Sequence, residues 1–420
     1  MTRVDWQANR HIPACAAAVL ASLDLSRAPR PVPERSDSEW RAALYFADRN
    51  QLALLVRGVC EPQLPEPVRH RLDRDYAVNR ERLLRMREVF READSALRTR
   101  GIECVLLKGF AGIADYVRDP NARVQYDLDL YCPHHARAAS DVLEELGYQK
   151  AGSADPAADH LPPLVRQTGW QWRGDFFDPA IPISIEIHHR LWDEQTEGLE
   201  APGLDAFWER RVSIEDGPAD YLSLHPADAF AYKSLHALRH LLRGEFRAAH
   251  LYELGWFLHH RAGDDSFWSE WAQLHPHRLR ALQAVMARMA EVWFGCRMHA
   301  RVRAETDALP RPVQRWFDAS ASSAAESYFR PNKDELWLHL CLLPSWKAQA
   351  RVVRRRLVPV RLPGPLDTVF LEPGQRSRLK WRKRLEYWRY ASRRAAFHCH
   401  ALLPTLSRMA RMLRWYWSRV

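Results

Sequence analysis

Apolar residues recur at helical spacing through the first hundred residues and again beyond residue 203. A spacing of three to four residues gathers these side chains on one face, which is typical of helices packed against a core. A glycine at position 101 follows one such stretch, as is common at the end of a helix. The period predicts helices over 39–59, with Ser38 as N-cap, and over 75–98, 226–242 and 248–260.

Between these helical stretches the pattern changes to that of strands. A short apolar run over 102–107 predicts a buried strand. The segment 124–131 alternates instead, so that Asp127 and Asp129 face one side of a sheet and the leucines between them face the other.

A second alternating segment, 183–188, presents Glu186 and His188 on one face and isoleucines on the other. Strands interspersed with helices predict an α/β (α+β) fold with a mixed sheet, flanked by mainly helical regions. We predict four divisions of the chain. They are an N-terminal helical region over 1–100, a core over 101–200, a second helical domain over 201–346, and a tail over 347–420 with a proline-containing linker and basic amphipathic helices.

Charge is distributed unevenly along this chain. The formal net charge is +10, but the residues from 347 onward hold 19 Lys or Arg against 3 acids, which is +16 and leaves −6 for the rest. This asymmetry argues against a fold that binds nucleic acid over its whole surface. It predicts a localised anionic partner for the tail.

The cysteines indicate the compartment. Seven are scattered along the chain without a CxxC pair, which argues against a zinc ribbon or a disulfide framework and suits a reducing cytoplasm. No run approaches the roughly 20 apolar residues needed to span a bilayer. We therefore expect a cytoplasmic protein, with peripheral membrane contact left open by the basic tail.

The carboxylates on the two alternating strands suit metal-assisted phosphoryl transfer. Asp127 and Asp129 are two residues apart, about 6 to 7 Å between Cα atoms, so their oxygens can converge on Mg²⁺ or Mn²⁺. Glu186 would add a third oxygen ligand from a neighbouring strand. Lys108 and the Gly109 amide could contact a phosphate. Solvated aspartates on an open sheet face are the simpler alternative.

Several short motifs occur in an order that resembles a family of uncharacterised bacterial nucleotidyltransferases. They are Leu106-Leu107-Lys108-Gly109, Tyr116, Arg123 with Asp127-Leu128-Asp129-Leu130, Ile185-Glu186-Ile187-His188, and later His236, His240 and Glu253-Leu254. The resemblance covers residues 75–260 and implies a DNA-polymerase-β-like nucleotidyltransferase fold.

The resemblance implies transfer of a nucleoside monophosphate from a nucleoside triphosphate to an acceptor, which stays open among small molecules, peptides, proteins and RNA. Asp127, Asp129 and Glu186 would be the metal-binding and catalytic residues. The residues expected to contact the nucleotide are Lys108, Gly109, Arg123 and His188. For Arg123 the alternative is a surface ion pair, and for His188 a hydrogen-bonded supporting role.

Two other functions stay open. Phe110 stands where the superfamily usually has serine, so a relative that binds nucleotide without transferring it is one alternative. The other is an adaptor that acts on a membrane or RNA through the tail. His236 and His240, four apart on a predicted helix, have the spacing of zinc ligands, although packing or substrate contact is the more common reason for such a pair.

The tail is predicted to form basic helices over 376–394 and 401–420. In the second helix Leu402 and Leu406 belong to an apolar side and Arg408 to a basic side. Such a helix can lie on an anionic membrane, contact RNA, or dock its apolar side on the body with its arginines in solvent.

Overall fold

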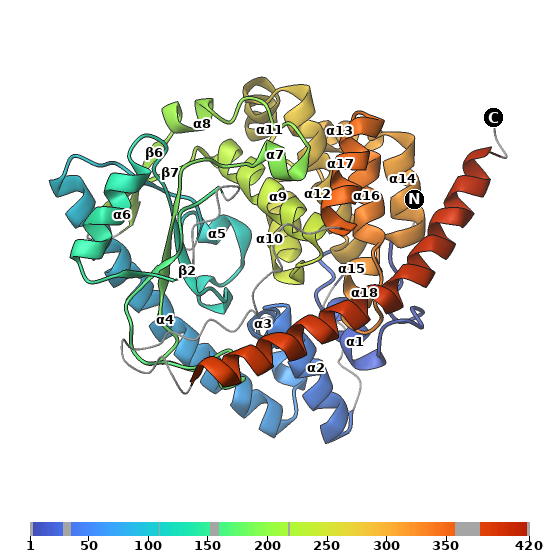
Figure 1. Cartoon of the computed structure of the whole chain (residues 1–420), viewed down its shortest axis with the longest axis horizontal. Coiled ribbons are helices and arrows are strands. Elements are labelled where there is room, and N and C mark those ends of the chain that lie inside the picture. Colours follow the sequence, from blue (N-terminus) through green and yellow to red (C-terminus); the bar gives the residue numbers. More distant parts are fainter. Residues whose placement is uncertain are drawn as a thin grey trace.

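A seven-stranded mixed sheet lies at the centre of the computed structural model, which describes residues 3–27, 35–108, 110–151, 159–216, 219–357 and 379–417. Helices cover both faces of the sheet (Figure 1), and this architecture confirms the predicted fold class. The strand order is β3-β4-β5-β2-β1-β7-β6. The strands are β1 Val105–Leu106, β2 Asp127–Tyr131, β3 Gln149–Lys150, β4 Leu164–Val165, β5 Ser184–His188, β6 Val212–Asp216 and β7 Ala219–Ser223.

The N-terminal helices differ from the prediction in their bounds: α4 begins earlier than the predicted 75–98, and the helix predicted before it is divided. The helix expected over 39–59 is two helices, because Gln51 adopts a left-handed backbone with φ 58° between them. Its expected cap is also wrong: Ser36 accepts a hydrogen bond from the Glu39 amide, and the Glu39 carboxylate accepts one from the Ser36 amide. This part contains α1 Ala14–Ser22, α2 Asp37–Arg49, α3 Ala53–Cys60, the 3₁₀ turn Glu61–Gln63 and α4 Glu66–Thr99.

The apolar face of the sheet packs against α4 and α6 (Ala136–Glu145). The core there includes the leucines of β2 and the isoleucines of β5, all of which are buried as the alternation predicted: Leu128, Leu130, Ile185 and Ile187.

The opposite face of the sheet meets the helical body, whose nearest parts are α9 (Pro226–Arg243) and α10 (Ala248–His260). Both agree closely with the predicted helices. Because side chains alternate along a strand, the acidic residues of β2 and β5 point toward this body. The connections between strands contain short helical elements. Along the chain, α5 Ile113–Tyr116 and the 3₁₀ turn Pro120–Ala122 lie between β1 and β2, and α7 Glu194–Glu197 and α8 Ala206–Glu209 lie between β5 and β6.

The body continues through a bundle of helices and ends in one long helix. Its members are α11 Asp265–Leu274, α12 His277–Phe294, α13 Ala300–Asp307, α14 Arg311–Ser320, α15 Ser323–Glu326, α16 Asp334–Leu342, α17 Trp346–Leu357 and α18 Leu379–Trp417. The two tail helices that we predicted are one, since α18 continues across residues 395–400, where we expected a break. The predicted linker over 357–374 lies almost wholly outside the described residues.

A disulfide joins Cys104 to Cys132, with 4.9 Å between their Cα atoms. Because Val105 pairs with Tyr131 in the antiparallel β1–β2 ladder, the two cysteines stand opposite each other one position further along. Their separation of 28 residues gave no indication of this pairing. Cytoplasmic location stays a prediction. Among the described residues no helix is both long enough and apolar enough to cross a membrane.

Candidate active site

Three acidic or imidazole side chains converge at the middle of the sheet. The strands β2 and β5 run parallel, in a register that sets Asp129 opposite Glu186. One ligand atom from each of Asp129, Glu186 and His188 lies within 4.8 Å of the others. Asp127, two residues earlier on β2, shares their face but is less enclosed, with 34% of its side chain exposed. The alternation of both strands therefore produces the acidic cluster that the sequence predicted.

Lys108 follows β1 and reaches into this cluster. Its Nζ lies 3.0 Å from Oδ2 of Asp129 and 3.5 Å from Oδ2 of Asp127. Burial alone would lower the pKa of Lys108, but the two aspartates raise it well above its ordinary value. The ammonium therefore stays charged and lies against the oxygens that a metal ion would use.

The surroundings push the pKa values of the two central carboxyl groups in opposite directions. Burial would raise the pKa of Asp129, but Lys108 and His188 hold it below its ordinary value. Burial and the nearby aspartates raise the pKa of Glu186. Lys108 thus offsets only part of the negative charge of the cluster, and an additional cation would favour the ionised form of Glu186.

A chain of charged side chains in contact leads away from Asp129 toward the helical body. His188 Nε2 lies 3.0 Å from Oδ1 of Asp129, and its Nδ1 lies 3.6 Å from Oδ2 of Asp159. Asp159 is in turn paired with Arg239 of α9. Burial would lower the pKa of His188, but Asp129 and Asp159 raise it to about 9. His188 is therefore a cation that fixes the orientation of Asp129, as in the supporting role left open above.

The sequence analysis did not identify Asp159 or Arg239. Asp159 lies in an irregular segment just before β4, where no period marks it. Arg239 was detectable, because it falls on the same face of a predicted helix as His236 and Arg243, at spacings of three and four residues.

Three histidines of α9 and α10 line the side opposite the carboxylates. His236 Nε2 is 3.2 Å from Nζ of Lys108 and 3.2 Å from Nε2 of His240, and the His250 ring centroid is 5.0 Å from that of His236. Burial, reinforced by nearby positive charges, lowers the pKa of all three well below the ordinary value. Among the described residues the metal-binding group does not include them, so the structure gives the zinc alternative no support.

Arg123 lies at the edge of the same cavity but not on the surface as an exposed ion pair. It is buried, its Nε lies 2.8 Å from Oε1 of Glu253, and it also bonds Gln125. Lys233 approaches the other oxygen of Glu253 at 3.5 Å. Burial lowers the pKa of Lys233 to about 8. The surface alternative for Arg123 is thus wrong, because the helical body covers this face of the sheet.

These groups enclose a cavity of about 270 Å³. Val124 is its only apolar lining residue in the described part of the chain, so a charged or strongly polar ligand suits it better than an apolar one. The cationic and imidazole groups that line it are Lys108, Arg123, Arg239, Arg243, Arg247, His160, His188, His236, His240 and His250.

The structure brings six of the seven predicted site residues into this one cavity: Lys108, Arg123, Asp127, Asp129, Glu186 and His188. Gly109, the seventh, lies outside the described residues. Phe110 is buried in the core, with ring centroids 5.4 Å from Phe90 and 5.5 Å from Tyr221. Tyr116 is also a core residue, as predicted, and stacks on Phe257.

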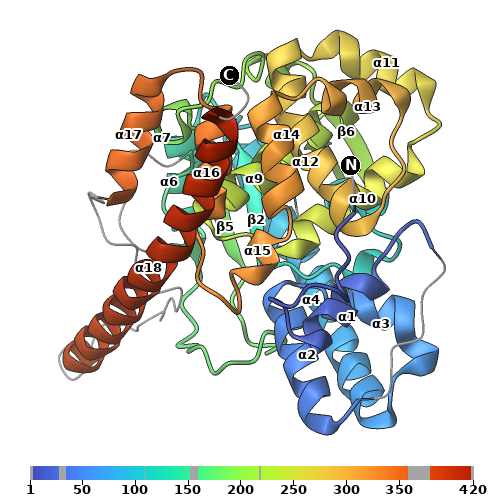
Figure 2. The same ribbon diagram turned by 90° about the vertical axis from the view of Figure 1, so that its right-hand side faces the viewer.

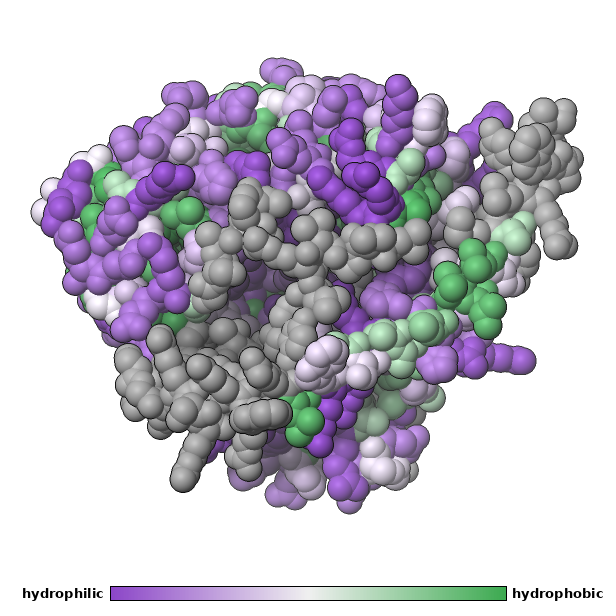
Figure 3. Space-filling view, in the orientation of Figure 1, coloured by the Kyte–Doolittle hydropathy of each residue, from purple (hydrophilic) through white to green (hydrophobic). Residues whose placement is uncertain are grey.

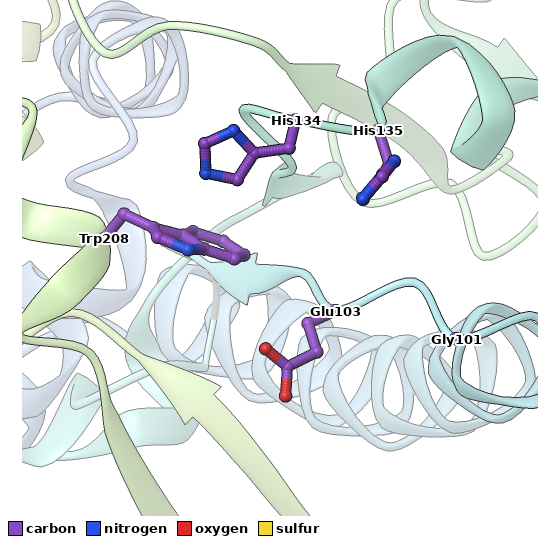
Figure 4. Close-up of a pocket in the computed structure, with 5 residues that line it drawn as sticks. All are labelled: Gly101, Glu103, His134, His135 and Trp208. Atoms are coloured by element: carbon purple, nitrogen blue, oxygen red, sulfur yellow. The ribbon is translucent and has the colours of Figure 1, made fainter.

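A second pocket, of about 260 Å³, lies at the opposite end of the β1–β2 pair (Figure 4). The edge of the His134 ring approaches Trp208 there at 5.6 Å between centroids, and Glu103 lies across from them. Glu103 is the one acidic residue among the described residues that line it, so this pocket offers a metal ion fewer oxygen ligands than the cluster on β2 and β5 does.

The sequence model of a family described as "uncharacterised nucleotidyltransferase" matches residues 36–295. The chain belongs to this family. The match includes every strand of the sheet, as well as α9 and α10. Neither the curated proteins nor the solved structures that were searched contain a match.

A divalent cation, which nucleotidyltransferases generally use, fits the groups of this site. Asp127, Asp129 and Glu186 offer the oxygen ligands that Mg²⁺ and Mn²⁺ prefer, and Lys108 alone does not balance their charge. His188 could act as a ligand only by giving up a contact with Asp129 or Asp159. The three carboxylates are therefore the better donor set.

Proposed function

We propose that this chain is a metal-dependent nucleotidyltransferase, which moves a nucleoside monophosphate from a nucleoside triphosphate to an acceptor. One observation carries the proposal: Asp127, Asp129 and Glu186 converge in a polar cavity whose opposite wall is cationic. A triphosphate, which is polyanionic, needs both positive side chains and a metal on the acidic side. Membership of the family supports the same reaction class.

The carboxylates would hold Mg²⁺ or Mn²⁺, which when bound neutralises negative charge on the phosphates. Arg243 and Arg247 face the cavity from the ends of α9 and α10 and would contact phosphate oxygens. The buried Nδ1 atoms of His240 and His250 have no hydrogen-bond partner among the described residues, so they can bond a ligand. Glu186 would complete the metal site or accept the proton of the acceptor.

Lys108 has two possible uses in this scheme. With the metal absent, its ammonium pairs with Asp127 and Asp129. With nucleotide present, the same ammonium can turn to a phosphate oxygen, because a lysine side chain is flexible and offers three donors. This exchange would leave the aspartate oxygens to the metal.

A second candidate function is nucleotide binding without transfer. Two observations favour it: the ammonium of Lys108 competes for the metal-binding oxygens, and Phe110 is buried where the superfamily usually has a serine that can hold phosphate. Such a protein would bind nucleotide and metal and release no pyrophosphate.

The experiment is thermal unfolding with each nucleoside triphosphate, with and without Mg²⁺ or Mn²⁺, followed by a pyrophosphate-release assay. A ligand at about 100 times its Kd adds roughly 2.7 kcal/mol to the free energy of unfolding. We expect a metal-dependent shift with at least one nucleotide, and its loss in Asp127→Asn/Asp129→Asn. The matched control is Asp141→Asn, an exposed aspartate of α6 on the other side of the sheet.

The outcomes separate the two functions. A metal-dependent shift with pyrophosphate release supports the transferase. The same shift without release, across the acceptor classes tested, supports the binding protein. If no pair of nucleotide and metal stabilises the wild type, or if the aspartate double variant responds like the wild type, both proposals fail.

A further inference from the structure

The C-terminal helix α18 presents its apolar side to solvent. This 39-residue helix would be about 58 Å long at 1.5 Å per residue. Figure 2 shows its N-terminal part extending away from the body, whereas its later part lies beside α16. Its large exposed apolar side chains are Leu385, Trp388, Leu402, Leu403 and Leu406.

These residues fall on one stripe of the helix. Leu385 and Trp388 are one turn apart, and Leu402, Leu403 and Leu406 follow four to five turns later on the same side. The exposed alanines 395 and 396 lie between the two groups. In Figure 3 a green stripe follows α18 along the face toward the viewer.

The helix is fixed to the body by its other, polar side. Arg408 pairs with Asp334, which begins α16, and lies 3.5 Å from an oxygen of Glu326 on α15. Ala401 and Thr405 are buried on this side, about two turns and one turn before Arg408 respectively. For the side chains of α18 that the structure describes, the alternative in which the apolar side docks on the body and the arginines lie in solvent is therefore wrong.

An apolar stripe of this kind is costly to leave in water, and partners that bury it are favoured. The charge next to the stripe indicates which partner. Arg389 and Arg393 are exposed at one edge of it. On α17, which both ribbon views place on the same side of the molecule, Lys347, Arg351 and Arg354 are exposed beside Trp346.

We propose that α18 is a membrane-surface helix that binds anionic phospholipid with this stripe. An apolar face containing tryptophan and leucine, bordered by arginines, can insert between lipid headgroups while the cations meet phosphate. A bilayer is favoured over RNA because the exposed stripe is mainly aliphatic. RNA binding of this kind would need a row of aromatic rings for stacking, whereas the exposed large apolar residues described on the stripe are four leucines and one tryptophan. The proposal is independent of the chemistry in the cavity.

The test uses the full chain and co-sedimentation with vesicles of phosphatidylserine and phosphatidylcholine, compared with vesicles of phosphatidylcholine alone. We expect binding to the anionic vesicles that weakens as salt is raised. Arg389→Gln/Arg393→Gln should lower the affinity about fivefold for each arginine. The triple variant with glutamine at positions 402, 403 and 406 should lower it by more than about tenfold.

The matched control is Leu84→Gln, which changes an exposed leucine of α4 and should bind vesicles like the wild type. Circular dichroism and the Tm of the triple variant check that α18 and the body remain folded. The proposal is overturned if anionic vesicles do not bind the wild type, or if the triple variant binds them equally well. A dimer that the triple variant abolishes, or RNA binding, without any binding to vesicles would overturn it too and would identify the other occupant.

Discussion

Replacing Lys108 by methionine tests whether its ammonium takes the place of a metal ion. Asp129 is fully buried and lies 3.0 Å from Nζ of Lys108. Removing one partner of a buried ion pair leaves the other charge uncompensated, at a cost of about 3 to 5 kcal/mol. For a chain of 420 residues that unfolds as one unit, this corresponds to a Tm lower by about 3 to 6 °C.

The assay is thermal unfolding of EDTA-treated protein, followed by titration with Mn²⁺ or Mg²⁺. In Lys108→Met the metal meets carboxylates that no ammonium occupies, so we expect tighter metal binding and a larger metal-dependent gain in Tm than in the wild type. Each tenfold gain in metal affinity corresponds to about 1.4 kcal/mol. Isothermal titration calorimetry gives that affinity directly.

Lys233→Met is the matched control. Lys233 is also buried and paired with a carboxylate, Glu253, at 3.5 Å, but it is not among the residues that line the cavity. Its loss should also lower the Tm, and metal should not restore it more than in the wild type. The reasoning is refuted if Lys108→Met binds metal no more tightly than the wild type, or if metal rescues both variants alike.

Three further predictions concern the pH profile and the disulfide. Burial raises the pKa of Glu186 above its ordinary 4.5, so its contribution to stability is complete below pH 4.5 and is lost as the pH rises through the raised pKa. Glu186→Gln should therefore raise the Tm of the metal-free protein at neutral pH. An unchanged or lower Tm would contradict this. The pKa of His188 rises from 6.5 to about 9, so about 3 kcal/mol of stability should disappear as the pH rises from 6.5 through 9, and urea unfolding of His188→Gln should show a flatter profile. Reduction of the Cys104–Cys132 disulfide with dithiothreitol should lower the free energy of unfolding of the wild type by about 3 to 4 kcal/mol. In Cys104→Ser, which lacks this bond, dithiothreitol should leave the Tm unchanged.

The sequence predicted those elements well whose period is strong and whose ends are marked. The helix α10 has the predicted bounds, and β5 differs from its predicted segment by one residue. The boundary between α2 and α3 was missed because it depends on one left-handed residue, Gln51, at which most sequences would simply continue a helix. The division between the two predicted tail helices, at residues 395–400, was also wrong: α18 runs through these residues without a break.

For the site, the period of two in each strand was enough to place Asp127, Asp129 and Glu186 on one face. The sequence pattern does not determine which segments lie side by side in the folded chain. The contact of His188 with Asp159, and that of Asp159 with Arg239, therefore could not be predicted. Asp159 and Arg239, which the sequence analysis did not identify, are paired although they are 80 residues apart in the chain.

The role of Lys108 shows why residue type and order alone leave function underdetermined. Its position after β1 suits a phosphate contact, and the order of motifs supports that reading. In the folded chain its ammonium instead lies within 3.5 Å of both aspartates, because β1 and β2 are antiparallel and the end of one meets the start of the other. Whether the lysine assists the reaction or blocks the metal then depends on whether nucleotide draws its ammonium away from these carboxylates. That competition is a difference in binding free energy, which the metal titrations of the wild type and Lys108→Met measure with and without nucleotide.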